Sequence, residues 1–312
     1  MHDKLIDEIK KLKIQKNAVI LAHNYQLPEI QDVADFVGDS LGLSQQAAKT
    51  NANLIVFCGV HFMAETASII APDKKVIIPD LNAGCSLADS ITKEDLIKWK
   101  ESFPNAVVVS YINTTAEIKA LSDYCVTSSN AVNVVNAIPK EQEILFLPDR
   151  FLGNYVKKVT GRNMEIWNGA CHVHEKIGDL EFNKAKEYYP NAEFLVHPEC
   201  GCSTSCMVKS LNQSADSNIK ILSTEGMVNY IDTSKSDEFV IATEVGILHR
   251  LNKFHPDKKF FPASPNSICE YMKLITLEKL HYALLNEVFE VRVDKLLADK
   301  AKLSIERMLS II

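Results

Sequence analysis

The sequence predicts an α/β protein built from three copies of one unit of strands and helices. Short apolar runs typical of buried strands occur at Val19–Leu21, Val107–Val109 and Phe194–Val196. The alanines that introduce these runs stand at positions 18, 106 and 192, and are therefore 88 and 86 residues apart. A recurrence at this period indicates a repeated structural unit. Polar side chains follow each run, as at the edge where open α/β sheets bind ligands.

The composition is that of an ordinary globular protein. The chain has 312 residues, of which 46% are hydrophobic, so it can bury a sizeable core. No apolar run approaches the roughly 20 residues that a membrane-spanning helix needs. Residues 1–13 are charged and amphipathic, unlike a secretory signal, and we expect a cytoplasmic protein without a membrane partner. The net charge of -6 argues against nucleic acid as a partner.

The first unit, residues 1–85, begins with a helix. Apolar side chains at helical spacing predict it over residues 2–16, and Asn17 ends it before the first strand. The other predicted elements of this unit are helices at 38–51 and 63–70 and strands at 54–58 and 75–78. The last strand continues through a polar loop to Cys85.

The second unit, residues 86–171, and the third, residues 172–269, repeat this order. Predicted helices lie at 93–102, 115–123, 131–137, 151–159, 180–189 and 246–253. Further predicted strands lie at 124–127, 144–147, 164–167, 220–222, 239–242 and 259–261. These units end at Cys171 and Cys269, as the first ends at Cys85. Residues 270–312 complete two closing helices, at 268–286 and 294–312, which we expect to pack back on the first unit.

The three cysteines at the unit ends suggest a metal centre. Cys85, Cys171 and Cys269 each follow the exit of a predicted strand, so packing the units around an axis would bring their thiols together. Three cysteines with one open position suit an iron–sulfur cluster that keeps one iron for substrate. Their simplest alternative role is that of buried small hydrophobic residues. Disulfides are not expected without a secretory signal.

A second set of cysteines has the more metal-like local spacing. Cys200, Cys202 and Cys206 form C-x-C-x3-C, which would suit a zinc hydrolase. They could equally be free thiols in a loop beside a site formed by His197 and Glu199. The spacing alone does not choose between these alternatives.

Several side chains at predicted strand ends are candidates for acid–base chemistry. His23 and His197 occupy equivalent strand ends, whereas His61, His172, His174 and His249 have no such position in their favour. Glu199 could act as a base or accept a hydrogen bond from an amine. Tyr25 and Tyr111 lie on the same predicted edge, although core packing would also explain them.

Small hydroxyl side chains precede two predicted helices. Ser128 and Thr224 stand where helices follow the second strands of their units. They are either simple helix caps or part of anion sites, because helix N-termini attract carboxylate and phosphate groups.

The ordered motifs resemble those of the quinolinate synthase family. The resemblance covers nearly the whole chain. The matching segments are AHNYQ at 22–26, VADFVGDSL at 33–41, MAETA at 63–67, YINTTAE at 111–117, TSSNAV at 127–132, PD at 148–149, CHVHEK at 171–176, HPEC at 197–200, STEGM at 223–227 and FPASPNSICEYMKLITLEKL at 261–280. The segment 201–217, which holds Cys202 and Cys206, is longer than in the shortest members of that family.

The resemblance implies three similar αβα domains with parallel sheets around a pseudo-threefold axis. It implies a [4Fe-4S] cluster in the central cavity, held by Cys85, Cys171 and Cys269. Tyr25, Glu199 and His23 become the candidates for proton transfer. The residues implied to bind substrate are His23, Ser40, Tyr111, Ile112, Asn113, Ser128, His197, Pro198, Glu199 and Thr224.

The activity that the resemblance implies is a step of NAD biosynthesis. Iminoaspartate and dihydroxyacetone phosphate condense to quinolinate, with loss of phosphate and two waters, and the cluster acts as a Lewis acid. An aspartate oxidase or dehydrogenase would supply the iminoaspartate. The alternative from another class is an iron–sulfur sensor or scaffold, whose open iron would report oxidation. The clustering of His, Glu, Tyr and Ser at strand ends favours the enzyme.

Overall fold

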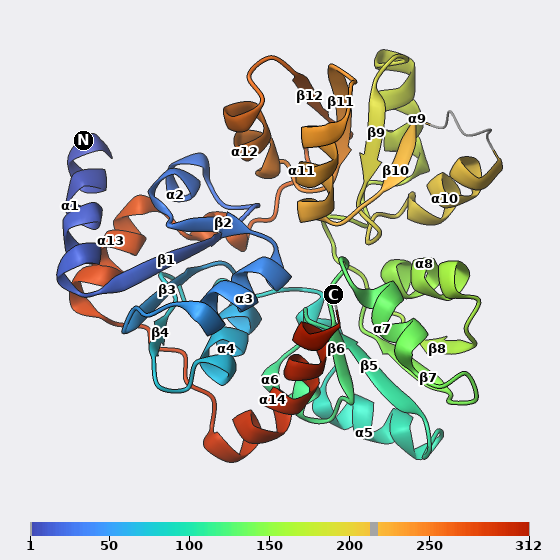
Figure 1. The fold of residues 1–312 in the computed structure, drawn as a ribbon, viewed down its shortest axis with the longest axis horizontal. Helices are drawn as coiled ribbons and strands as arrows, with labels where there is room; N and C mark the ends of the chain where they lie inside the picture. Colours follow the sequence, from blue (N-terminus) through green and yellow to red (C-terminus); the bar gives the residue numbers. More distant parts are fainter. Residues whose placement is uncertain (1, 213–217, 312) are drawn as a thin grey trace.

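The chain folds into three parallel sheets with helices on their faces, which confirms the predicted α/β class. The computed structural model describes residues 2–212 and 218–311. Each sheet has four strands, and their orders are β2-β1-β3-β4, β6-β5-β7-β8 and β10-β9-β11-β12. Every strand pair in them is parallel. The three sheet-and-helix layers surround a common centre (Figure 1), as the repeat predicted.

The strands of the three sheets occupy equivalent positions along the chain. The first sheet contains β1 (Ala18–His23), β2 (Phe36–Gly38), β3 (Leu54–Cys58) and β4 (Lys75–Ile77). The second contains β5 (Val107–Tyr111), β6 (Tyr124–Val126), β7 (Ile144–Leu147) and β8 (Met164–Ile166). The third contains β9 (Glu193–Val196), β10 (Ile219–Ile221), β11 (Glu238–Ala242) and β12 (Lys259–Pro262). The central strands of each sheet are almost fully buried, since helices cover both faces.

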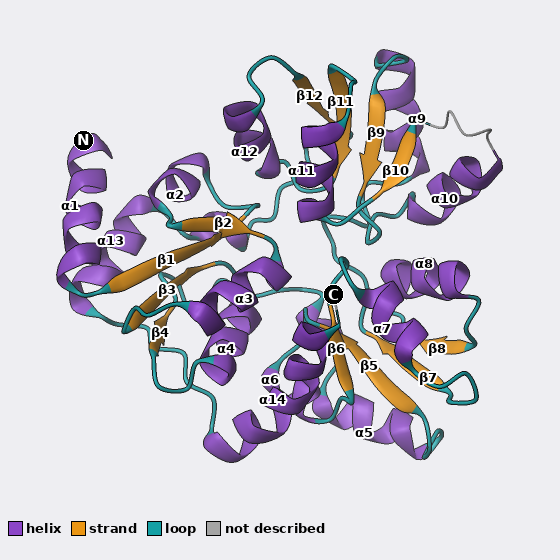
Figure 2. Ribbon diagram, in the orientation of Figure 1, coloured by secondary structure: helices purple, strands orange, loops and turns teal. Residues whose placement is uncertain are grey.

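Helices connect the strands in each unit (Figure 2). The first unit has α1 (His2–Gln15), α2 (Pro28–Val33), α3 (Ser40–Lys49) and α4 (His61–Ile70), and the 3-10 turn η1 (Ala88–Ser90) follows it at the start of the second. The second has α5 (Lys93–Glu101), α6 (Ala116–Ala120), α7 (Ala131–Ala137) and α8 (Arg150–Thr160). The third has α9 (Asp179–Tyr188), α10 (Ser203–Asn212), α11 (Thr224–Thr233) and α12 (Ile247–Phe254), and the chain closes with the 3-10 turn η2 (Met272–Leu274), α13 (Leu277–Asn286) and α14 (Lys295–Ser310). No helix among the described residues is both long and apolar enough to cross a bilayer.

Three stretches differ from the sequence-based expectation. The helix expected from residue 38 starts at Ser40, because Asp39 caps it by accepting a hydrogen bond from the Gly42 N–H, and α2 and β2 precede it. Helix α10 was not predicted, since its cysteines, serines and threonine give no clear apolar periodicity. The helix expected from residue 268 begins only at Leu277, after the capping residue Thr276.

The two closing helices pack in different places. Helix α13 lies beside α1 of the first unit. Helix α14 packs mainly on α6 and β6 of the second unit, and also on α4 of the first (Figure 1). Helix α14 thus contacts the first unit, as expected, but lies mainly against the second. Its buried face meets residues of both units, so it joins them.

One buried asparagine anchors the end of α14. The Asn130 side-chain amide donates to the carbonyls of Met308 and Ile311, and its Oδ1 accepts from the Thr127 N–H at 2.9 Å. We expect Asn130→Ala to lower the free energy of unfolding by about 1–3 kcal/mol, because it leaves buried backbone groups without partners. Urea unfolding measures this. The exposed Asn286, whose side-chain amide donates to the Tyr282 carbonyl one turn earlier in α13, provides Asn286→Ala as the control. Equal midpoints for the two variants would contradict the anchoring role.

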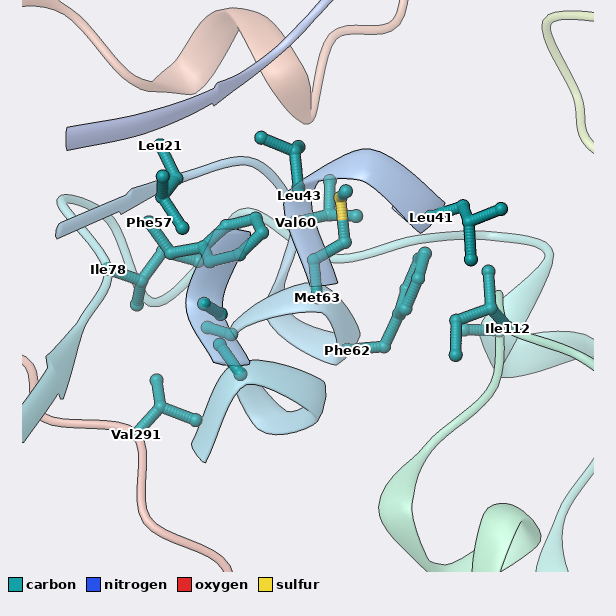
Figure 3. Packing of buried hydrophobic residues seen from close by; sticks show 14 of the residues in the cluster. Leu21, Leu41, Leu43, Phe57, Val60, Phe62, Met63, Ile78, Ile112 and Val291 are labelled. Carbon is teal, nitrogen blue, oxygen red and sulfur yellow. The ribbon is translucent and has the colours of Figure 1, made fainter. Parts of the chain in front are cut away.

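The largest apolar core spans the first and second units. Ile112, from the loop after β5, packs near Leu41 and Phe62 of the first unit (Figure 3). The two faces of the third sheet have separate cores. The first two units are thus joined by continuous apolar packing, whereas the third meets them mainly through polar contacts near the centre.

Candidate functional site

A cavity at the centre of the molecule is lined by all three units. It gathers most of the residues that the sequence suggested. Its walls include His23, Tyr25, Ser40, Cys85, Tyr111, Asn113, Ser128, Cys171, His197, Glu199, Thr224 and Cys269. Ile112 and Pro198 are the two suggested site residues whose side chains are not part of the wall. Ile112 is buried in the apolar core instead, and Pro198 is buried as well.

Three equivalent turns carry the cysteines of the cavity. In each unit, one backbone N–H lies at or just before the start of the helix that follows the third strand, which is β3, β7 or β11. This N–H donates a hydrogen bond to the loop before the cysteine. These bonds run from His61 to Ala83, from Arg150 to Gly169 and from Val245 to Ser267, at 2.7, 2.9 and 3.0 Å. Each cysteine lies two residues beyond the accepting carbonyl. The fold therefore delivers Cys85, Cys171 and Cys269 from matching positions.

The local geometry of the three cysteines is also the same. Each cysteine carbonyl accepts a hydrogen bond from the N–H four residues later. Each sulfur is approached by the N–H groups two and three residues later, which are those of Leu87 and Ala88, Val173 and His174, and Tyr271 and Met272. Such N–H groups stabilise a thiolate. The three turns are therefore built to hold negatively charged sulfur.

These turns fit a cluster with three cysteine ligands. Burial raises the pKa of Cys85 to about 12 and that of Cys269 to about 11, and it raises that of Cys171 as well. Buried thiols with such pKa values ionise readily only beside a cation, and iron in a cluster provides that charge. Three thiol donors from three units, with N–H groups aimed at sulfur, match the donor set of an iron–sulfur centre.

The other cysteines of interest pack in the core of the third unit. Cys200, Cys202 and Cys206 are fully buried among apolar side chains. The Cys200 thiol donates to the Ala242 carbonyl at 3.1 Å. The described residues contain one group of three potential metal-ligand atoms within 4.8 Å of one another, and it consists of Cys171, His174 and Glu199. The C-x-C-x3-C spacing therefore does not gather into a zinc site.

Glu199 is at the centre of a buried hydrogen-bonded network. The Tyr111 hydroxyl donates to its Oε1. Its oxygens lie 3.5 Å from Nδ1 of His174 and 3.6 Å from Nδ1 of His197. Burial raises the pKa of Glu199 to about 8, the Asp149 carboxylate adds to the rise, and the Tyr111 hydroxyl opposes it. A carboxyl group with this pKa can hold or release a proton near neutral pH.

Tyr25 lies on the opposite side of His174 from Glu199. Its hydroxyl is 2.5 Å from the Thr243 hydroxyl, which is 2.9 Å from Nε2 of His174. Burial lowers the pKa of His174 to about 3, so its ring is neutral and can accept a proton at one nitrogen while it donates from the other. Burial likewise lowers the pKa of His23 to about 3. Tyr25, Thr243 and His174 are thus hydrogen-bonded to one another, and Nδ1 of His174, which has no hydrogen-bond partner among the described residues, lies 3.5 Å from Glu199.

Hydroxyl groups near two helix N-termini face the same cavity. Ser40 begins α3 and Thr224 begins α11, and the side-chain amide of Asn24 donates to the Thr224 hydroxyl at 3.4 Å. The Ser128 hydroxyl is 3.2 Å from Nε2 of His197. Oδ1 of Asn113 is buried and has no hydrogen-bond partner among the described residues. An unpaired buried polar atom in a cavity wall is typical of a ligand site.

Some site residues were not selected from the sequence. Asp39, Thr243 and Glu244 were not named, although Thr243 and Glu244 directly follow β11, where the strand-end rule applies. His174 was grouped with the histidines that had no special position. Its role comes from the Cys171 turn, which points it back between Tyr25 and Glu199. The sequence feature that could have identified His174 is the pair of histidines that stand one and three residues after Cys171.

Comparison with known proteins shows which family has this site. The family model described as quinolinate synthetase A protein matches residues 7–310. A quinolinate synthase of Pyrobaculum aerophilum is 54% identical over 304 residues, covering 97% of this chain and 98% of the relative. One from Thermus thermophilus is 54% identical over 307 residues, covering 98% and 97%. One from Mycobacterium tuberculosis is 50% identical over 306 residues, covering 97% and 88%.

The match extends over almost the entire chain, including all three units and both closing helices. It is consistent with the ordered motifs that the sequence shares with this family. The chain is therefore an enzyme that belongs to the quinolinate synthase A family.

Proposed function

We propose that the chain condenses iminoaspartate with dihydroxyacetone phosphate to form quinolinate, in the cytoplasm. The observation that carries this proposal is the convergence of three equivalent cysteine turns on one cavity that also holds Glu199 and Tyr25. The membership of the family and the named relatives support the reaction type. The three units would then end at residues 85, 171 and 269, so that each contributes one cysteine.

Cys85, Cys171 and Cys269 would hold a [4Fe-4S] cluster. When bound, it supplies an iron with an exchangeable position that can act as a Lewis acid toward a substrate oxygen. A sensor role would leave the histidines, Glu199 and Asn113 of the cavity wall without a purpose. Their burial around an enclosed site supports an enzyme, since substrate chemistry benefits from the exclusion of water.

The cavity wall offers neutral and weakly positive groups for the anionic substrates. The N-termini of α3 and α11 present Ser40 and Thr224, and helix N-termini favour carboxylate and phosphate groups. Ser128 adds a hydroxyl group, held by His197. The amide of Asn113 would orient a substrate group through its unpaired oxygen, which accepts hydrogen bonds. These groups would fix the two reactants relative to one another.

The chain of groups from Tyr25 to Glu199 would move protons during the tautomerisation and dehydration steps. Glu199 would take a proton from a substrate atom, because its pKa lies near the working pH. Tyr25 would exchange a proton with Thr243 and His174, which contact its hydroxyl. Nδ1 of His23 accepts a hydrogen bond from the Tyr25 backbone N–H at 3.2 Å. The His23 ring is neutral and lines the same cavity, so it would also face the substrate.

Tyr25→Phe tests this proton chain. We expect kcat to fall by about 10²–10⁴-fold while the cluster stays in place, because the ring remains and only the hydroxyl is lost. Steady-state kinetics and the visible spectrum measure the two effects. Tyr155, outside the cavity, provides Tyr155→Phe as the matched control. A Tyr25→Phe enzyme with the rate of the control would remove Tyr25 from the mechanism.

The function itself is tested by turnover of purified, anaerobically prepared protein. An aspartate oxidase or dehydrogenase would supply iminoaspartate in the assay, as we propose it does in the cell. We expect quinolinate and phosphate to form in equal amounts when both substrates are present. No quinolinate from a chain that carries its full iron content would overturn the proposed activity and favour the sensor.

A further inference from the structure

A largely buried ion pair lies at the edge of the cavity, whose wall includes Glu244 but not Lys273. Glu244 is the second residue after β11 and Lys273 lies in η2, and the Lys273 ammonium is 3.0 Å from Oε1 of Glu244. Glu244 is fully buried. An ion pair in this position loses hydration, so it persists only where further hydrogen bonds satisfy its atoms.

Both partners of the pair bind backbone groups of functional segments. Oε1 of Glu244 accepts the Cys269 N–H at 3.1 Å, and Oε2 accepts the Gly246 N–H at 2.6 Å. The Lys273 ammonium donates to the backbone carbonyl of Tyr25, which lies 248 residues earlier in the chain. The pair therefore connects a cysteine turn of the third unit to the Tyr25 loop of the first.

The packing around Gly246 shows how tightly this connection is made. A Cβ atom at Gly246 would lie 2.8 Å from Oε2 of Glu244, from the Lys273 ammonium and from the Tyr25 carbonyl carbon. No other residue fits at that position without moving the pair or the Tyr25 backbone. Gln31 also donates to the Gly246 carbonyl, at 2.9 Å. The loop after β11, the Tyr25 loop and the ion pair thus form one close-packed contact between units.

The equivalent position in the other units differs. The backbone N–H groups that bond to the loops before the three cysteines belong to His61, Arg150 and Val245. The residues just before these donors, Val60, Asp149 and Glu244, therefore occupy equivalent positions. Asp149 is fully buried, and the N–H groups of Leu152, Phe151 and Cys171 stabilise its carboxylate. The side chain of Val60 has no acceptor atom. A carboxylate thus supports two of the three cysteine turns, and only the one at Cys269 is paired with a cation that reaches the Tyr25 loop.

We propose that the Glu244–Lys273 pair is a positioning device that holds the Cys269 turn and the Tyr25 backbone at a fixed separation. This inference rests on the proposed function. Glu244 acts through the backbone of a cluster ligand and Lys273 through the backbone of Tyr25, so neither residue needs to touch substrate. Because the pair carries no net charge, it also fixes the Cys269 turn without adding charge beside the cluster.

Three variants separate these effects. Lys273→Met removes the donor to Tyr25, and we expect kcat to fall by about 10- to 100-fold with an unchanged KM, as for other groups that orient the residues around a metal site. Glu244→Gln keeps an acceptor for the Cys269 N–H but leaves the Lys273 charge uncompensated, so the reduction potential of the cluster should become more positive. In the double variant we expect the potential to return toward that of the wild type while kcat stays low.

The readouts are a spectroelectrochemical titration of the cluster without substrate, the iron content, and steady-state kinetics. Lys279→Met is the matched control, because the Lys279 ammonium pairs with Asp80 and the Leu274 carbonyl rather than with Glu244 and the Tyr25 carbonyl. Should Lys273→Met not fold, Glu244→Gln alone tests the charge effect. A normal kcat in Lys273→Met, or a wild-type potential in Glu244→Gln, would overturn the proposal. A wild-type chain that holds a cluster but forms no quinolinate would instead defeat the proposed function.

Discussion

Replacement of Cys85, Cys171 or Cys269 by serine is expected to abolish both the cluster and quinolinate formation. Each thiol comes from a turn whose N–H groups face the sulfur, and the other two turns cannot supply a replacement donor. Serine preserves the size of the side chain, but its hydroxyl does not provide the thiolate that iron in such clusters prefers. Iron and sulfide analysis of each purified variant, with its visible spectrum, measures the loss.

The controls for these variants are Cys202→Ser and Cys206→Ser. Both thiols are buried in the core of the third unit and do not line the cavity. We expect both control variants to keep the full cluster, although they can lose some stability through the burial of a hydroxyl group. A full cluster in Cys171→Ser, or its absence from a folded Cys202→Ser protein, would contradict the assignment of the ligands.

Glu199→Gln is expected to lower kcat by about 10²–10⁴-fold while leaving the cluster and substrate binding intact. The amide has nearly the same shape as the carboxyl group, so the Tyr111 hydroxyl can still donate to it. The amide cannot take up a proton, however, so a proton passed by His174 would have no acceptor at position 199. Single-turnover kinetics together with equilibrium binding of substrate separates the chemical step from binding.

Glu175→Gln is the matched control for Glu199→Gln. Glu175 lies on the same segment as His174 but is exposed and pairs with Arg150. We expect this variant to have the wild-type rate, because Glu175 does not line the cavity and exposed ion pairs contribute little to stability. A rate for Glu199→Gln within a few-fold of this control would reduce Glu199 to a structural residue.

Much of the fold followed from the sequence because apolar runs and their period were strong signals. Strands β3 and β7 have the predicted bounds, since Leu54–Cys58 and Ile144–Leu147 are continuous apolar runs. Strand β2, a three-residue edge strand in which Phe36 and Val37 are only half-buried, was not found. The other three-residue edge strands were predicted, whereas β2 ends in Gly38 and offers an apolar run of only two residues.

The placement of α14 could not be read from local sequence. Its amphipathic pattern shows that one face is buried but not which unit covers it. The deciding contacts are long-range, such as the Asn130 amide at the helix end and the bond from Ser304 to the Lys119 carbonyl. A contact between residues that far apart depends on how the units pack around the axis.

The candidate site was predictable where residues followed strand ends, and less so elsewhere. His23, Glu199 and the three unit-ending cysteines were found from position and resemblance, and the structure places them around one cavity. The resemblance also suggested Ile112, whose side chain packs into the core rather than toward the cavity. Lys273 gave no signal, because its position beside the Tyr25 carbonyl exists only after two distant segments meet.

The most direct measurement is the iron and sulfide content of the protein prepared without air, together with its visible spectrum. A cluster held by three equivalent turns predicts iron and sulfide in equal amounts, at the ratio of one [4Fe-4S] cluster to each chain, with the broad absorption of such clusters. The same protein should form quinolinate, and loss of iron to a chelator should end that activity in step. Zinc in place of iron, or quinolinate formation by a chain that contains no iron, would contradict the assignment of the site.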